Sequence, residues 1–186
     1  MSKTQLRNRL IQMPNAMRIH RDAIAKEAMN TEKGVGYLLE IAFESNDKTA
    51  IKSAWILDII AVSKPLLFLP FISLFCNQIN QLTKESAKRP FAKVASILTL
   101  AARKEENIYF TKKQQEQLIE THFDWLTTNS AIAVKVYSME TLYQLGYESS
   151  WVHPELKLIL LQCISTESPG YRAHGKKILK SLQAVL

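Results

Sequence analysis

The sequence contains few of the residues that a β-sheet protein needs for its turns. Among 186 residues there are only five glycines and six prolines, and neither Asn-Gly nor Asp-Gly, the pairs that favour tight hairpins, occurs. An all-β chain needs such turns about every eight to twelve residues. The shortage of turn residues therefore predicts a helical protein.

Cysteines and long apolar segments are also scarce. Cys76 and Cys163 lie in apolar segments with helical spacing, where a free thiol acts as a small apolar group, although the sequence leaves a disulfide open. The longest apolar segment, residues 65–76, contains two prolines and is shorter than the ~20 apolar residues of a membrane-spanning helix. No apolar segment follows Arg9, as it would in a secretory signal. We expect a cytoplasmic protein that does not bind a membrane.

The sequence also lacks the residue sets that catalysis or metal binding requires. The four histidines are scattered, without a His-x-x-x-His or Cys-x-x-Cys pair to bring metal ligands onto one face. No Gly-x-Ser-x-Gly elbow marks a serine nucleophile. Gly34-Val35-Gly36 lacks the third glycine of a dinucleotide fingerprint and indicates a helix start or break. The sequence therefore predicts no cofactor and no metal, and it favours a non-enzymatic protein.

The composition is that of a folded protein with a basic surface. Hydrophobic residues make up 47% of the chain and charged residues 22%, and the length fits one domain over residues 1–186. The formal net charge is +7. Such a charge attracts polyanions or an acidic partner, although excess Lys and Arg can equally serve only to solvate a helical surface.

An internal repeat of about forty residues runs through the chain. Four segments align through a basic residue that is followed seven positions later by Leu or Ile, and the steps between them are 41, 42 and 37 residues. A period of about 40 residues is typical of helical solenoids. The residue three positions before each basic residue is a proline or another residue suited to the first turn of a helix. We therefore predict that a helix begins at each of these positions. The basic residues are Lys52, Lys93, Lys135 and Arg172, and the residues before them are Thr49, Pro90, Ile132 and Pro169.

Further helices are predicted between and before the matched segments. Apolar residues at spacings of three and four indicate helices over 70–83, 112–127 and 154–164, and a less regular pair over 15–30 and 34–44. Two faces are clearly apolar: Leu118, Ile119, His122, Trp125 and Leu126 in one helix, and Ile178, Leu179, Leu182 and Val185 in the last. Polar residues that are expected to cap helices precede the matched segments at Ser45–Asp47, Glu85-Ser86, Thr128–Ser130 and Ser165–Ser168.

This layout resembles the HEAT and armadillo repeat proteins, in which a helix of the form Pro-x-x-basic-x-x-Ala-x-x-x-Leu is followed by an antiparallel second helix. The resemblance covers about three quarters of the chain. It implies an all-α fold, a right-handed α–α superhelix or solenoid of HEAT-like helix pairs, that works as a binding scaffold. The residues that match the form are Pro90, Lys93, Ala95 and Leu100, with the small residue one place early, and Pro169, Arg172 and Leu179.

Within the same fold, the sequence resembles the HEAT-like bacterial glycosylases that remove alkylated purines from DNA. Those enzymes bind DNA with a basic face and use Trp and Asp side chains near the lesion. In this sequence, Trp55 is followed three positions later by Asp58, which is a similar arrangement. The resemblance implies a nucleic-acid-binding protein with Trp55 and Asp58 near the DNA. From the residues alone, Trp55 can instead be a core anchor, and Asp58 a surface charge or an interhelical hydrogen-bond partner.

Short all-helical chains of this kind also resemble some proteins labelled adenylosuccinate lyase. That enzyme depends on a flexible Ser-Ser-x-Met-Pro-x-Lys loop, whereas Ser138-Met139 of this chain is not followed by Pro and Lys. The residues therefore do not predict lyase activity.

The C-terminal segment is the best candidate for contact with an anion or a nucleic acid. Its basic residues recur at a spacing of four, which places them along one side of a helix, where they can neutralise phosphates. Arg103-Lys104, followed by Glu105 and Glu106, is instead predicted to stabilise a helix C-terminus. We predict a scaffold that binds a protein, with nucleic acid as the alternative partner; the oligomeric state does not follow from the sequence. The candidate contact residues are Arg172, Lys176, Lys177 and Lys180, together with Trp55 and Asp58.

Overall fold

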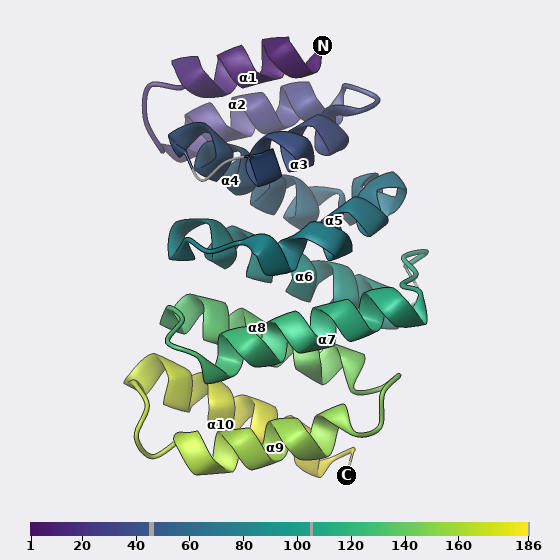
Figure 1. Ribbon diagram of the computed structural model, residues 1–186, viewed down its shortest axis with the longest axis vertical. Coiled ribbons are helices and arrows are strands. Elements are labelled where there is room, and N and C mark those ends of the chain that lie inside the picture. The colour runs from purple at the N-terminus through teal and green to yellow at the C-terminus, as the bar shows by residue number, and fades with distance from the viewer. Residues whose placement is uncertain (45–46, 105, 186) are drawn as a thin grey trace. The chain divides into compact units, whose positions relative to one another are not determined.

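The chain folds into helices joined by short connections (Figure 1). The computed structural model describes residues 1–44, 47–104 and 106–185, and in these ranges it contains no β-strand. The predicted all-α class is therefore confirmed. The elements are α1 Lys3–Gln12, α2 Arg18–Met29, α3 Gly34–Glu44, α4 Lys48–Ser63, the 3-10 helix η1 Pro65–Phe71, α5 Ile72–Gln78, the 3-10 helix η2 Ile79–Gln81, α6 Glu85–Arg103, α7 Lys112–Thr127, α8 Ile132–Leu145, α9 Val152–Cys163 and α10 Pro169–Gln183.

The helices group into two compact units. The first comprises Met1–Val94 and the second Ala95–Leu186. Helix α6 crosses the boundary between them, so that its N-terminal half belongs to the first unit and its C-terminal half to the second. The single domain over residues 1–186 stays a prediction.

In the first unit, helices α3 and α4 pack against each other, and the other elements pack on this pair. Helices α1 and α2 contact both of them, and so does η1. The side chains of Leu38 and Leu39 on α3 and of Ile56, Leu57 and Ile60 on α4 are almost completely buried. Burial of such side chains is the main source of stability in a helical unit of this size.

Two basic residues of the repeat tie their helices to earlier helices. The Nζ of Lys52 on α4 donates to the carbonyl oxygens of Leu10 and Met13, each at 2.9 Å. These carbonyls lie at the end of α1, where backbone groups need partners from outside their helix. Lys93 on α6 reaches back in the same way and lies 2.6 Å from Asp58 on α4. The matched basic positions in this unit therefore join helices that are not neighbours in the sequence, α4 to α1 and α6 to α4.

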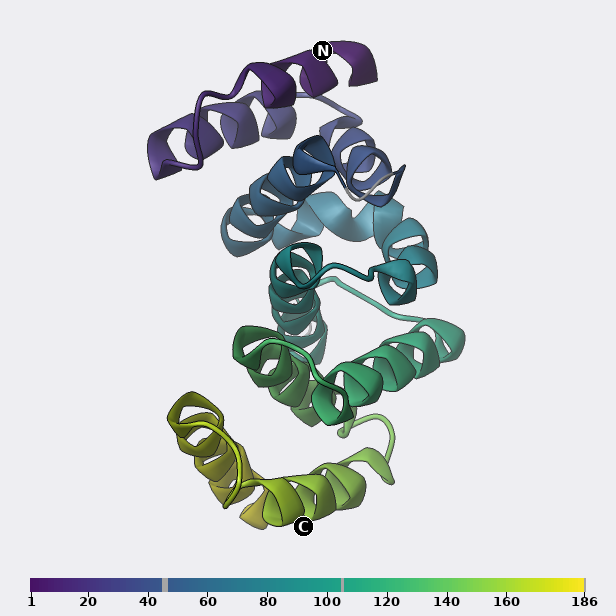
Figure 2. The same cartoon turned by 60° about the vertical axis from the view of Figure 1, so that its left-hand side comes forward.

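In the second unit, helix α8 is central. It contacts α7, α9 and α10, and α9 also contacts α10 (Figure 2). Residues 128–131 join α7 to α8 and residues 164–168 join α9 to α10. Connections this short make packed neighbours antiparallel. The apolar face predicted for α7 is buried, as expected, at Leu118, Ile119, His122, Trp125 and Leu126.

Several helices occur where the sequence predicts them. Helices α3 and α7 have the predicted bounds, and α2 and α9 lie within a few residues of theirs. Gly34, in the glycine pair that predicts a helix start or break, is the first residue of α3. The predicted helix over 70–83 is instead divided, because Pro70 lies in the 3-10 helix η1 and α5 spans only Ile72–Gln78.

Three details of the sequence prediction are wrong. Pro90 is predicted in a first helical turn, but α6 begins at Glu85, so that Pro90 lies inside the helix. A proline inside a helix removes one N–H donor and crowds the carbonyl of the residue four positions earlier, here Ser86, so packing rather than local preference determines the start of α6. Ser86 is likewise helical rather than part of a link, and Val185 is 39% exposed because α10 ends at Gln183.

Two of the predicted caps are present. The Asp47 side chain accepts a hydrogen bond from the backbone N–H of Ala50 at the start of α4, and Ser168 accepts one from Tyr171 at the start of α10. Ser45 and Asn46, which belong to the same predicted cap as Asp47, lie outside the described residues. The cap of α8 is Ala131, which has no polar side chain, so Thr128–Ser130 do not supply it.

Both cysteines are free thiols, so the disulfide that the sequence leaves open is not formed. Cys76 is buried, and this burial raises the pKa of its thiol to about 12. Cys163 is half-buried at the end of α9. At neutral pH, Cys76 is therefore a protonated and unreactive core residue.

No single helix of the described ranges is long and apolar enough to cross a membrane. Helix α4 and the segment Pro65–Gln81 reach that length and composition only together, and they are bent by 119° with respect to each other. Eight of the 16 residues of α4 are buried within the first unit, as expected for a core helix.

Candidate interaction surface on the last helix pair

Three of the four predicted basic residues on α10 form one exposed row. Arg172, Lys176 and Lys180 are spaced by four positions, so they lie above one another on the same side of the helix, and all three are exposed. In the part of the chain that the structure describes, none of the three has an ion-pair partner. These three residues, the basic row, therefore have positive charge available for a partner.

The fourth residue, Lys177, has a different environment. Its Nζ lies 3.2 Å from Oε1 of Glu140 on α8, and the Nε2 of His174 lies 2.9 Å from the same oxygen. The hydrogen bond to His174, followed by the one to Lys177, lowers the pKa of the Glu140 carboxyl, against the opposing effect of burial. Lys177 thus helps to hold α10 against α8 and is not part of the basic row.

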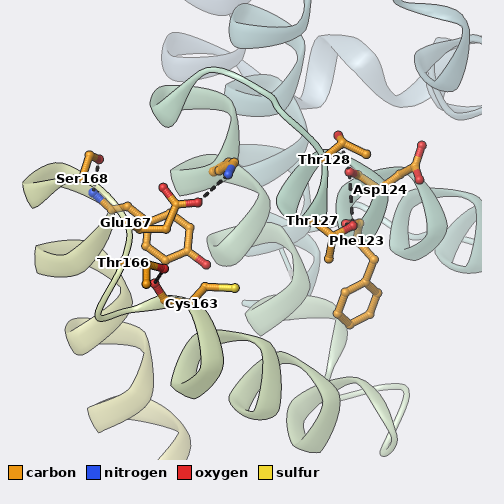
Figure 3. Close-up of polar contacts among 10 residues, drawn as sticks. Phe123, Asp124, Thr127, Thr128, Cys163, Thr166, Glu167 and Ser168 are labelled. Carbon is orange, nitrogen blue, oxygen red and sulfur yellow. Dashed lines mark hydrogen bonds and ion pairs between the residues drawn. The ribbon is translucent and has the colours of Figure 1, made fainter.

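The connection between α9 and α10 is held by polar contacts (Figure 3). Nζ of Lys135 on α8 lies 2.6 Å from Oε1 of Glu167 and 5.7 Å from the ring centre of Tyr171. The Thr166 hydroxyl donates to the carbonyl oxygen of Cys163 at 3.1 Å. Because Lys135 and Glu167 are largely buried, their pairing fixes where α10 begins relative to α8.

Helix α9 has a second apolar side that faces solvent. Trp151 is 57% exposed, Leu158 51% and Leu161 56%, and Pro154 is also exposed. These four residues, the apolar row, follow one another at spacings of three, four and three positions and so lie along one side of the helix. The opposite side of α9 is buried at Val152, Leu156 and Leu160.

The Trp151 ring packs on an aromatic ring of the neighbouring helix α7. Its ring stacks on that of Phe123 of α7, with ring centres 5.6 Å apart and planes inclined by 23°. Phe123 lies one turn before Thr127, whose hydroxyl donates to the Phe123 carbonyl at 2.9 Å (Figure 3). An aromatic ring that is supported on one face and exposed on the other is a common anchor in protein interfaces.

The apolar row and the basic row come nearest to each other at Leu161 and Lys176. A Cβ atom at Gly175 of α10 would lie 3.4 Å from a methyl carbon of Ile164 and 3.6 Å from one of Leu160, so the two helices meet at this point. Both helices are right-handed and they run in opposite directions, so the residues that follow these contact positions, Leu161 and Lys176, turn to the same side, whereas Leu158 and Lys180 lie further round their helices, away from the contact. We call the apolar row together with Lys176 the terminal face.

Trp55 and Asp58 lie on α4 of the first unit. Trp55 is half-buried. Oδ1 of Asp58 lies 2.6 Å from Nζ of Lys93, with 22% of the Asp58 side chain exposed. Asp58 thus takes part in an interhelical ion pair. This agrees with the structural alternative given for it from the sequence, an interhelical hydrogen-bond partner. The structure brings together Arg172, Lys176 and Lys180, whereas Trp55 and Asp58 belong to a different unit.

Arg103 and Tyr147 form another polar contact in the second unit. Arg103, in the last turn of α6, lies over the ring of Tyr147 with 4.9 Å between its Cζ atom and the ring centre. Glu105, which the sequence groups with Arg103, lies outside the described residues. Beside Arg103 is a cavity of about 220 Å³ that Gln115 and Glu148 also line, smaller than most small-molecule pockets. Within the described ranges, no three His, Cys, Asp or Glu residues are placed to hold a metal ion.

Comparison of the sequence with protein-family models gives no match, and neither does a search of curated proteins. The terminal face is therefore interpreted from its own geometry.

The apolar row was not predicted from the sequence. The apolar spacing predicts a helix over 154–164 but does not distinguish Leu158 and Leu161 from the buried Leu156 and Leu160. A signal was present, because residues 156–161 are apolar at every position except Lys157. A helix that is apolar nearly all round has more than one side to cover.

Proposed function

We propose that the chain is a non-enzymatic helical-repeat scaffold, a right-handed α–α superhelix of HEAT-like helix pairs, and that it binds a protein partner through the terminal face. The observation that carries the proposal is the terminal face itself, where Leu158 and Leu161 are exposed on one side of α9 and the exposed Lys176 of α10 turns to the same side as Leu161. An exposed apolar patch with a polar rim is typical of protein interaction sites.

The packing inside each unit supports the scaffold part of the proposal. Lys52 and Lys93, at matched positions of the repeat, tie their helices to earlier ones. In the second unit, α8 and α10, which carry successive matched segments, contact each other directly. Repeat proteins are stable because each helix pair covers its apolar side by packing against the next pair.

The chemistry of the terminal face favours a protein partner over a nucleic acid. Leu158 and Leu161 gain little next to a phosphate backbone, and leucine offers no flat ring on which bases could stack. Surfaces that bind DNA are much more polar and more positively charged than this one. The alternative, a nucleic-acid-binding protein, depends on the basic row and on Trp151 alone, without the two leucines.

Capture of the native partner tests the proposed function. The wild-type chain and a Leu158→Gln/Leu161→Gln variant are immobilised and incubated with an extract of the native cell, with and without nuclease. We expect the wild type to retain a specific protein after nuclease treatment and the variant to retain about tenfold less of it, because the centre of the interface is lost. Both side chains are more than half exposed, so the free energy of unfolding should change by less than about 0.5 kcal/mol.

An Ile132→Gln variant is the matched control. Ile132 is 45% exposed at the start of α8, outside the terminal face, and its replacement should leave capture unchanged. Loss of all captured protein on nuclease treatment of the wild type would favour the nucleic-acid alternative. Capture by the double variant at the wild-type level would show that the terminal face is not the binding surface.

A further inference from the structure

We propose that the cavity beside Arg103 in the second unit binds a free α-amino acid with an apolar side chain. The cavity has a volume of about 220 Å³ and lies between the last turns of α6, the segment that leads into α7, and the end of α8. None of its lining residues belongs to the terminal face. The site is therefore separate from the proposed protein-binding surface and adds a small-molecule ligand to it.

Two unpaired side chains of opposite charge line this cavity. Arg103 is the last residue of α6, Glu148 lies in the turn that follows α8, and both are exposed. Within the described ranges, neither forms an ion pair with the other or with any further residue. An α-amino acid carries a carboxylate and an ammonium group at neutral pH, so one such molecule complements both charges at once.

The Arg103 side chain is oriented by the ring of Tyr147. Its Cζ atom lies over that ring, 4.9 Å from the ring centre. The Tyr147 hydroxyl oxygen in turn lies 2.8 Å from that of Tyr143, which holds the ring in place. A guanidinium that rests on an aromatic ring keeps the N–H groups at its edge available for a carboxylate, which it binds through two parallel hydrogen bonds. Arg103 is therefore suited to hold the carboxylate of the ligand.

Gln144 supplies a buried acceptor on the other side of the charge pair. It lines the cavity, is 7% exposed, and has an Oε1 atom that is buried without a hydrogen-bond partner in the described ranges. A buried amide oxygen without a donor costs free energy, which a ligand donor in the cavity can recover. Gln144 precedes Glu148 by four positions along the chain. An ammonium group has three N–H donors, so it can bind Glu148 and still donate to Gln144.

The remaining wall of the cavity is apolar. Ile108 is completely buried, Leu145 is 4% exposed, and Phe110 is half-buried. The Gln115 Nε2 donates to the carbonyl oxygen of Phe110 at 3.4 Å, which ties this segment to α7. Such a wall favours an apolar ligand side chain. The cavity is smaller than the ~300 Å³ at which drug-sized pockets begin, so it selects a ligand of about the size of leucine.

Titration of the full chain with L-leucine, followed by backbone amide NMR spectra, tests the proposal. We expect the resonances of the cavity-lining residues to shift, with a Kd of about 1 mM. Isocaproic acid has the same apolar group without the ammonium, and isoamylamine has it without the carboxylate. Each should bind at least about fivefold more weakly than leucine, because one of the two charged contacts is lost.

Two charge-removing variants assign each end of the ligand. Arg103→Gln should weaken leucine binding at least about fivefold and leave isoamylamine binding unchanged, whereas Glu148→Gln should weaken leucine and leave isocaproic acid unchanged. Gln144→Met removes the buried amide and should weaken leucine and isoamylamine. Lys104→Gln and Glu116→Gln remove the same charges from exposed residues outside the cavity and should bind leucine like the wild type.

Three results would overturn the proposal. One is the absence of shifts in the cavity-lining residues at about 20 mM leucine. Another is equal affinity of the wild type for leucine and its two singly charged analogues. The third is an equal loss of all three probes in Arg103→Gln or in Glu148→Gln, because neither residue would then recognise one particular charge of the ligand.

Discussion

The Phe91→Ala variant is expected to lose about 3–5 kcal/mol of its free energy of unfolding. Phe91, in the N-terminal half of α6, is 1% exposed, and its ring packs against two others. The ring centre of Phe43 on α3 lies 4.8 Å away and that of Phe75 on α5 lies 5.8 Å away. Truncation to alanine removes these contacts and leaves a cavity among three elements of the first unit.

Urea denaturation at constant pH measures this loss. Tyr109→Ala is the control, because Tyr109 is 71% exposed and its truncation should change the free energy of unfolding by less than about 0.5 kcal/mol. A loss below about 1 kcal/mol for Phe91→Ala would contradict the packing of α6 against α3 and α5.

Acidification from pH 8 to pH 5 is expected to lower the free energy of unfolding by about 2 kcal/mol through His122 alone. His122 is completely buried on α7, with its Nδ1 3.0 Å from the hydroxyl oxygen of Ser138 and its ring edge-on to Trp125. Burial lowers the pKa of its imidazole from 6.5 to about 3. Charging the imidazole in this apolar position would cost more than its contacts can offset.

The direction of this pH effect follows from the protonation of His122 in the folded and in the unfolded chain. Above pH 6.5, His122 is neutral in both the folded and the unfolded chain and has no effect on the pH dependence. Between pH 6.5 and about 3 only the unfolded chain binds the proton, so stability falls as the pH falls, by up to about 1.4 kcal/mol per pH unit. The carboxyl pKa values of Glu27, Glu44 and Glu140 are lowered in the folded chain, so these groups stabilise it when they are ionised. That stability is lost mainly below about pH 4.5, outside the measured range.

A His122→Gln variant isolates this contribution. It cannot titrate, so we expect its stability to change by about 2 kcal/mol less than that of the wild type over the same range. Chemical denaturation curves recorded at half-unit intervals of pH provide the comparison. Equal pH dependence in the two proteins would mean that His122 is accessible to protons in the folded chain.

The helical class and much of the detail follow from local sequence patterns. Apolar spacing and a Thr111 cap at the boundary give α7 its bounds, and Ser168 with Pro169 marks the start of α10. Local signals are weakest where packing decides the outcome. Helix α1 was not predicted, because it is mostly polar and has only Leu6 and Leu10 as buried residues. It is ordered by packing on α3 and α4.

The candidate site was predictable only in part. The spacing of Arg172, Lys176 and Lys180 predicts a basic row, and the structure places all three on the exposed side of α10. The sequence does not show that Lys177 pairs with Glu140, because that contact joins residues 37 positions apart. Nor does it show which side of α9 remains uncovered, since a buried and an exposed leucine give the same local pattern.

Photo-cross-linking in the native cell tests the central claim most directly, that the terminal face binds a protein. A photoreactive phenylalanine analogue is placed at Leu158 in one variant and, as a control, at the exposed Glu116 of α7 in another. We expect a cross-linked protein that resists nuclease for the analogue at position 158 and no such product for position 116. A nuclease-sensitive product at position 158, or the same protein cross-linked equally from both positions, would contradict it.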